Sequence, residues 1–259
     1  MKLYVFIFAF VATISYSQEF TKAIEDNSFF IEEAYNQEAN VIQHIFNGTT
    51  FSPGNILETS FTEEWPIFDQ KHQLSITVPY QYSLAGTRIS QGISDLMVNY
   101  RYQFMNEHGL AVAPRVSIIL PTGDNKNGSG NGAVGVQLNL PVSKRFSDEI
   151  VTHYNAGYTV IPNARSSSTP SKETVSEYLF GASAIYLANK SFNVMAEVLY
   201  TSSSSPLGRT NELIVSPGVR WAIDIGELQI VPGLAFPIHF VNGNKDDGFV
   251  LYLSFEHSY

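Results

Sequence analysis

The side chains that could do chemistry in this 259-residue chain are polar and charged residues that recur at every second position of long segments. Arginines and carboxylates share this phase, so opposite charges could pair across neighbouring segments as a structural network. The same rows could instead form a selective path that orients a polar or anionic group of a solute. The candidates are Asp95, Asn99, Arg101, Gln103, Arg115, Ser117, Gln137, Asn139, Arg145, His153, Asn155, Glu177, Glu197, Glu212, Arg220 and Glu256.

Patterns typical of an active site or a metal centre are weak. The chain has no Cys, and its 6 His are scattered without the HExxH spacing of a metalloprotease. No GxSxG nucleophile motif is present. His153 and Asn155 lie two residues apart, which leaves a membrane-embedded hydrolase as an alternative. We therefore expect no catalytic residue, no metal and no cofactor, and a protein that is not an enzyme.

The composition excludes one class of partner and favours one class of fold. Only 15% of residues are charged, against about a quarter in an average protein. The net charge of -9 argues against nucleic acid as a partner, because a nucleic-acid binder needs a basic face. Aromatic residues make up 13% of the chain, which suits many half-buried strands.

The elements that must position the polar rows are long strands, because the apolar period is two from about residue 40 onward. Leu96, Val98 and Tyr100, for example, alternate with Asn99 and Arg101. Most of these strands exceed the length of about 9–11 residues that a tilted strand needs to cross a bilayer. We predict about twelve strands (10–14), at 40–47, 56–68, 72–84, 92–104, 109–120, 133–146, 149–162, 174–188, 191–202, 210–224, 227–239 and 247–259.

The connections between these strands alternate in length. Short turns are expected at 69–71, 105–108, 147–148, 189–190 and 225–226, and long polar loops at 48–55, 85–91, 121–132, 162–173, 203–209 and 240–246. This alternation is typical of an outer-membrane barrel with short periplasmic turns and longer extracellular loops. A soluble sandwich also alternates, but the apolar face here is rich in Tyr and Phe, as in the aromatic girdles of membrane barrels. The predicted fold is an all-β, antiparallel transmembrane β-barrel.

The two ends of the chain read differently from its middle. Residues 1–17 resemble a signal peptide that is cleaved near Ser17/Gln18, so we expect export to the outer membrane of a Gram-negative-type bacterium. Residues 18–39 are expected to form either a periplasmic lead or a short helix that plugs the lumen, where Glu32 and Glu33 would meet arginines. Residues 40–259 are expected to form the barrel, in contact with outer-membrane lipid. The last strand ends in the aromatic Tyr259, which resembles the signal read by the barrel-assembly machinery.

Glycines and prolines on the inward phase carry two further expectations. Gly181, Gly218 and Gly233 would permit curvature or leave room for a plug. Pro79, Pro141 and Pro237 predict bulges or local breaks in the ladder of hydrogen bonds. A break in the wall would allow a hydrophobic solute to leave sideways.

Several segments occur together in an order that resembles a known family. They are DNSFFIEEAYNQEANVIQH (26–44), GISDLMVNYRYQF (92–104), PRVSIILPTGD (114–124), VQLNLPVSKRF (136–146) and HYNAGYTVIPNA (153–164). Together they resemble the outer-membrane barrel family labelled meta-pathway of phenol degradation, which is described as transporter-like. The resemblance implies passage of small organic compounds, hydrophobic or aromatic ones among them, and it implies no catalytic residue.

Three functions follow as expectations. The first is a channel for passive uptake or export of small organic solutes. The second is a closed structural or surface-binding barrel without transport, which a fully occluded lumen would favour. The third is the membrane-embedded hydrolase.

Overall fold

The computed structural model describes residues 24–25, 28–52, 55–85, 88–165, 171–205 and 208–258. No helix within these ranges is long and apolar enough to cross a membrane. The predicted signal peptide and Tyr259 lie outside the described residues. The strands are β1 (Val41–Ser52), β2 (Ile56–Ile67), β3 (Asp69–Ala85), β4 (Arg88–Ile93), β5 (Leu96–Tyr102), β6 (Met105–Glu107), β7 (Leu110–Val112), β8 (Arg115–Leu120), β9 (Gly135–Arg145), β10 (Ile150–Arg165), β11 (Lys172–Asn189), β12 (Phe192–Ser205), β13 (Gly208–Trp221), β14 (Ile223–Ile225), β15 (Leu228–Ala235), β16 (Ile238–Val241) and β17 (Asn244–Ser258).

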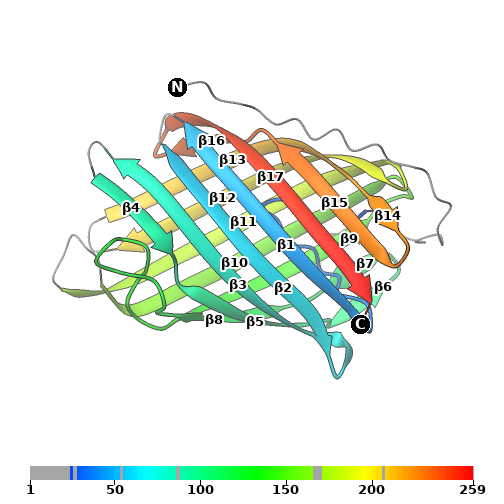
Figure 1. Cartoon of the computed structure of the whole chain (residues 1–259), viewed down its shortest axis with the longest axis horizontal. Helices are drawn as coiled ribbons and strands as arrows, with labels where there is room; N and C mark the ends of the chain where they lie inside the picture. Colours follow the sequence, from blue (N-terminus) through cyan, green and yellow to red (C-terminus); the bar gives the residue numbers. More distant parts are fainter. Residues whose placement is uncertain are drawn as a thin grey trace.

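These segments form one antiparallel sheet that closes on itself (Figure 1). The first and last strands pair along their whole length, from Val41 opposite Ser258 to Ser52 opposite Asp247. Because the sheet closes, it has no free edge with unpaired backbone groups, and a lipid environment does not tolerate such an edge. Some barrel strands are interrupted, so the 17 segments make up twelve strands, as predicted: β1, β2, β3, β4–β6, β7–β8, β9, β10, β11, β12, β13–β14, β15–β16 and β17.

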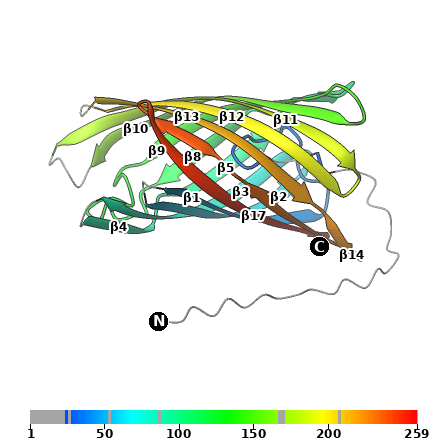
Figure 2. The ribbon, with the colours of Figure 1, turned by 90° about the horizontal axis from the view of Figure 1, so that it is seen from above.

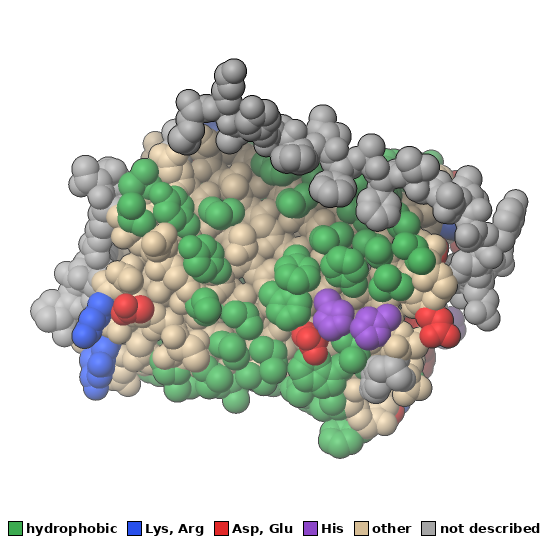
Figure 3. All heavy atoms as spheres, viewed as in Figure 1, with side chains coloured by type: hydrophobic (Ala, Val, Ile, Leu, Met, Phe, Trp, Pro, Cys, Tyr) green, Lys and Arg blue, Asp and Glu red, His purple; other side chains and the backbone are tan. Residues whose placement is uncertain are grey.

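The two faces of the wall have the polarity of a membrane barrel. Along β12, Asn193, Met195 and Glu197 point inward and are buried. Val194 and Val198 point outward, with exposed fractions of 43% and 41%. Figure 3 shows hydrophobic side chains spread over the strands of one outer face. A sandwich would bury this apolar face, so the outward placement decides between the two β architectures.

Several connections that the sequence predicted as long loops are mostly strand. β1 continues to Ser52 and β2 starts at Ile56, and β16 and β17 are separated only by Asn242 and Gly243. These two residues have φ of 49° and 89°, the left-handed values of a tight hairpin turn that favours Asn-Gly. The predictions for 48–55, 85–91, 203–209 and 240–246 were therefore too long, because polar Ser, Thr and Asn residues also pair in extended hairpins. The connection predicted at 121–132 is a long loop, and it extends over 121–134.

Two of the inward-phase prolines lie opposite interruptions in the neighbouring strand, and the third lies in an interruption of its own strand. Pro79 lies opposite the break between β4 and β5, and its carbonyl accepts a hydrogen bond from Ser94 N–H (2.8 Å). The Pro141 carbonyl accepts from Ala113 N–H at the break between β7 and β8 (3.1 Å). The Pro237 carbonyl, between β15 and β16, accepts from Gly248 N–H (2.8 Å). Of the three, Pro79 lies at a bulge, because the pairing shifts by one residue between Thr77 opposite Met97 and Tyr80 opposite Ile93. At Pro141 and Pro237 the register is the same on both sides of the interruption.

Candidate functional site

The interior of the barrel holds the polar rows that the sequence singled out. Ten of the predicted inward residues are buried: Asp95, Asn99, Arg101, Gln103, Ser117, Asn139, His153, Asn155, Glu197 and Arg220. The other six are half-buried: Arg115, Gln137, Arg145, Glu177, Glu212 and Glu256. The alternation of the strands places all of them on the inner wall.

The chain segment that precedes β1 lies inside the barrel, where these side chains hold it. Figure 2 shows this described part of the segment between the walls. The backbone N–H groups of Phe29, Phe30 and Ile31 all donate to one oxygen of Glu197, at 3.1, 2.9 and 3.2 Å. Successive N–H groups that converge on one carboxylate form an anion-binding nest. Glu197 thereby fixes the innermost turn of the segment.

Two arginines bind the acidic residues of the same segment. Arg115 donates to both carboxylate oxygens of Glu32, at 2.9 and 2.7 Å. Arg101 donates to Glu33 Oε1 at 3.0 Å and also to the carbonyl of Tyr35 at 2.7 Å. Arg101 and Glu33 are nearly inaccessible to solvent, so this ion pair is buried and hydrogen-bonded on several sides. The sequence placed Glu32 and Glu33 opposite lumen arginines, and this is where they lie.

Amide and hydroxyl side chains satisfy the backbone of the segment. Asn155 accepts from Glu32 N–H (2.9 Å) and donates to its carbonyl (2.8 Å). Gln103 likewise accepts from Asn36 N–H and donates to the carbonyl of Ala34. The described residues of this segment form no helix, contrary to the helical expectation for a plug. The reason is that their N–H groups bond to the barrel wall rather than to carbonyls four residues earlier.

Three glycines of the inner wall leave space for the apolar side chains of the segment. A Cβ at Gly233 would lie 2.7 Å from the Phe29 ring. At Gly218 a Cβ would collide with Phe29, and at Gly181 it would collide with Ile31. The Phe29 ring in turn packs edge-on against Tyr252, with centroids 5.8 Å apart. For these three inward-phase glycines the sequence suggested two explanations, curvature of the strand or room for a plug.

The other predicted residues serve different parts of the interior. Asp95 accepts from Gly123 N–H (3.0 Å) and Asn131 N–H (2.7 Å), so it holds the loop 121–134. Arg145 pairs with Glu25, and Glu256 accepts from Gln43. Arg220 lies over the Tyr252 ring at 5.6 Å. Glu177 and Glu212 lie on β11 and β13 towards the strand ends remote from Val41 and Ser258, where Glu212 contacts His239 Nε2 at 3.1 Å.

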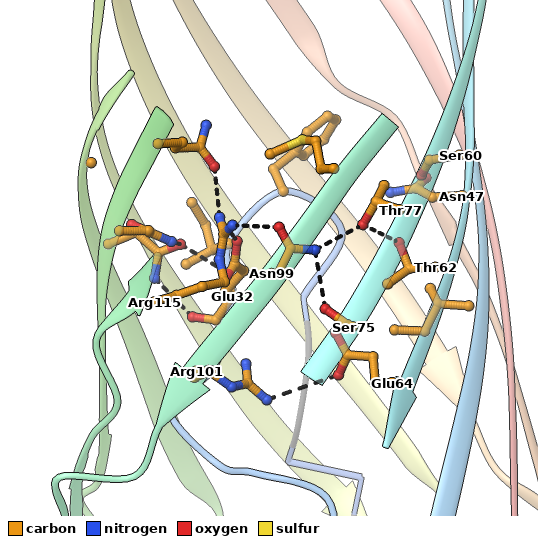
Figure 4. Close-up of a pocket in the computed structure, with 18 of the residues that line it drawn as sticks. Glu32, Asn47, Ser60, Thr62, Glu64, Ser75, Thr77, Asn99, Arg101 and Arg115 are labelled. Carbon is orange, nitrogen blue, oxygen red and sulfur yellow. Dashed lines mark hydrogen bonds and ion pairs between the residues drawn. The ribbon is translucent and has the colours of Figure 1, made fainter. Parts of the chain in front are cut away.

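A cavity of about 340 Å³ remains beside the innermost turn of the segment. Figure 4 looks into it and shows Glu32 and Arg115 on one side and Thr62, Ser75 and Thr77 on the other. Asn99 bridges the two sides, since it donates to Ser75 and Thr77 and accepts from Arg115. A second cavity of about 350 Å³ also borders Phe30, and Pro79 and Glu58 line it. The interior thus combines a held segment with space for small molecules.

The family model described as "Putative MetA-pathway of phenol degradation" matches residues 15–231. The chain belongs to this family. Among solved structures, an outer membrane channel from Pseudomonas putida F1 is 12% identical, with a TM-score of 0.65 over 87% of this chain and 98% of that chain. The KdgM porin is 9% identical (TM-score 0.55, 84% and 99% covered), and the NanC porin is 10% identical (0.55, 82% and 98%). These identities establish the barrel fold alone. A search of curated proteins gives no significant match.

In this member of the phenol-degradation family, a serine lies close enough to His153 to resemble the nucleophile and base of a hydrolase. Both side chains are too buried for a substrate to reach them. Ser143 Oγ lies 2.7 Å from His153 Nδ1, which is the separation of a nucleophile and its base. Both residues are fully buried. Ser143 also accepts from Ala34 N–H, and His153 Nε2 lies 2.9 Å from the carbonyl of Glu25. The pair therefore joins the N-terminal segment to β9 and β10.

Sequence reasoning missed some residues that bind the segment. Gln73, on β3, accepts from Gln37 N–H at 2.8 Å, and Ser183 bonds to Ser28 at 2.8 Å. Tyr252, an aromatic residue on the inner face of β17, receives Phe29. The alternation of strand residues carried a signal for all three, because each follows the inward phase of its strand. Alternation does not show which chain segment an inward side chain contacts, so it did not identify these three residues as binding the N-terminal segment.

Proposed function

We propose that this protein is an outer-membrane channel through which small organic solutes pass passively, hydrophobic or aromatic compounds among them. The observation that carries the proposal is the pair of cavities inside a closed barrel, next to a segment held only by noncovalent contacts. Arg115 and the neighbouring amides could orient a polar group, while Met97, Ile45 and Leu179 offer apolar contact. Solved barrels with this fold include porins and an outer membrane channel, which supports the proposal.

The proposal includes a route to the membrane. Cleavage near Ser17/Gln18 would release the mature chain into the periplasm. The C-terminal sequence with its aromatic Tyr259 would be read by the barrel-assembly machinery. The strand ends near Val41 and Ser258 would then face the periplasm, and the N-terminal segment would enter the lumen from that side.

The test is solute flux through the purified protein in liposomes, with a chemically broad panel of sugars, organic acids and aromatic compounds. Flux above empty vesicles for at least one class is expected. A complete absence of flux across the panel would contradict the proposal. Heat-modified gel mobility and circular dichroism confirm that the protein tested is folded.

A closed structural barrel is the second candidate, and a specific observation favours it. Residues 28–37 fill part of the lumen, and the Arg101–Glu33 pair is buried with exposed fractions of 4% and 1%. Deletion of residues 28–37 separates the two functions. If the intact protein passes nothing while the deletion variant passes many solutes, the segment is a permanent seal and the closed barrel is correct.

A further inference from the structure

Two histidines face each other on the outer wall, at the seam where the barrel closes. His44 lies on β1 and His257 on β17, and both point away from the lumen because their neighbours Gln43 and Glu256 point into it. The pairing of Ile42 with His257 and of His44 with Phe255 makes them diagonal neighbours across the first and last strands. Their Nε2 atoms are 3.2 Å apart. Figure 3 shows two His side chains side by side on this face, next to acidic side chains.

The partners of the other ring nitrogens favour one arrangement of protons. His44 Nδ1 lies 3.4 Å from Glu63 Oε2, and His257 Nδ1 lies 3.0 Å from the carbonyl oxygen of Ser258. A carboxylate and a carbonyl both accept, so the tautomer that suits these partners carries its proton on Nδ1. In that tautomer both Nε2 atoms carry lone pairs, 3.2 Å apart, and a shared cation would stabilise them. With the other tautomer in one ring, the same two atoms form an N–H···N hydrogen bond.

The separation suits a transition metal. Zinc binds imidazole nitrogen at about 2.0–2.1 Å, which places two ligands of a tetrahedral site about 3.3 Å apart. Histidine ligands commonly donate their second N–H to a carboxylate or carbonyl, the role that Glu63 and the Ser258 carbonyl have here. We propose that His44 and His257 bind a divalent transition metal ion such as Zn²⁺ through their Nε2 atoms. Water completes the coordination.

The surroundings of the pair agree with a site at the rim of the membrane. His44 is accessible from outside, with 27% of its side chain exposed. Its ring stacks on Phe61, with planes 9° apart, while Phe46 packs against both Phe61 and Phe255. Both histidines lie within four residues of the strand ends at Val41 and Ser258. A bound ion would tie the first strand to the last, so its binding energy would stabilise the closed barrel.

This site has two protein ligands, which explains why ligand spacing in the sequence did not reveal it. No group of three or more His, Cys, Asp or Glu side chains suited to a metal occurs among the described residues. The two histidines are 213 positions apart in the chain and meet only when the barrel closes. The proposed site departs from the expectation of no metal, which rested on the spacing of ligands in the sequence.

The experiment is a titration of the full-length protein in detergent with Co²⁺, followed by visible absorption, and with Zn²⁺, followed by calorimetry. The purification tag must contain no histidine. One saturable ion per chain is expected. His44→Gln and His257→Gln should each weaken binding at least tenfold, and Glu63→Gln by about tenfold, the cost of losing an outer-shell partner. His72→Gln is the matched control, since His72 is another outer-wall histidine, bonded to the Tyr100 hydroxyl at 2.7 Å.

A second readout reports on the seam itself. Zn²⁺ should raise the temperature at which the folded band disappears on gels for the wild type and for His72→Gln, but not for His44→Gln or His257→Gln. Failure of the wild type to bind Co²⁺ or Zn²⁺ saturably would overturn the proposal. So would wild-type affinity in folded His44→Gln or His257→Gln protein.

Discussion

At the scale of single residues, Arg115 makes the contact that best tests how the N-terminal segment is held. It donates two hydrogen bonds to Glu32 and one to Gln137. Hydrogen bonds to charged groups contribute roughly 1.5–3 kcal/mol. Arg115→Ala should therefore loosen the segment and raise solute flux in liposomes several-fold. Lys245→Ala, which removes the exposed pair with Asp247, is the control and should change neither flux nor stability. Equal flux in the two variants would count against a gating role for Arg115.

The protonation of Glu32 gives the same contact a pH dependence. Enclosure in the lumen would raise the pKa of the Glu32 carboxyl, but the charges of Arg115 and Arg101 outweigh it and hold the pKa below its ordinary value of 4.5. A lowered pKa means that the stabilisation is complete above about pH 4.5 and is lost as the pH falls through the lowered pKa. Flux should therefore rise in acid, and Glu32→Gln should raise flux already at neutral pH and flatten this response. If folded Glu32→Gln protein still showed a steep rise of flux in acid, another titrating group would be the cause of the acid response.

At the scale of elements, the loop 121–134 depends on one carboxylate of the barrel wall. Asp95 accepts from Gly123 N–H, Asn131 N–H and the Asn131 side chain. Asp95→Asn removes the charge and one acceptor, so the loop should open more often. Trypsin cleavage after the exposed Lys126 should then become about tenfold faster, given roughly 1.5–3 kcal/mol for a charged hydrogen bond.

The control for this loop is Asp148→Asn. Asp148 lies in an exposed turn, and among the described residues only its backbone carbonyl, not its side chain, takes part in a hydrogen bond. Its cleavage rate at Lys126 should match that of the wild type. An unchanged rate in Asp95→Asn would mean that the close approach of Gly123 and Gly130 is enough to hold the loop.

The elements also show what alternation can and cannot predict. It located twelve strands and their inward faces, because each strand must divide lipid from lumen along its whole length. It placed Asp95 on the correct face, but not against the loop that it holds. The apolar spacing before β1 suggested either a short helix or a periplasmic lead, whereas Glu197, Asn155 and Gln103 accept hydrogen bonds from the backbone N–H groups there. Those partners lie far away in sequence, and they become neighbours only through the register of the closed sheet.

At the scale of the whole molecule, the barrel has an apolar outside and a polar inside, and this polarity sets the cost of a charge on each face. Val198 points outward near the middle of β12, with 41% of its surface exposed. Thr201 points inward on the same strand and pairs with Glu212 across it. An arginine on a lipid-facing wall costs about 2–4 kcal/mol near the bilayer midplane. An arginine at position 201 would instead have a carboxylate beside it and access to water.

Val198→Arg should therefore lower the free energy of unfolding from liposomes by about 2–4 kcal/mol, and Thr201→Arg by less than about 1 kcal/mol. Urea titration of folding into liposomes, followed by tryptophan fluorescence, measures both on the same strand. The two variants introduce the same residue three positions apart on one strand, facing outward in one and inward in the other. Equal losses of stability for the two variants would mean that the outer face of β12 does not meet lipid. The expected difference would instead mean that lipid contact is the reason that this chain places its hydrophobic side chains outside.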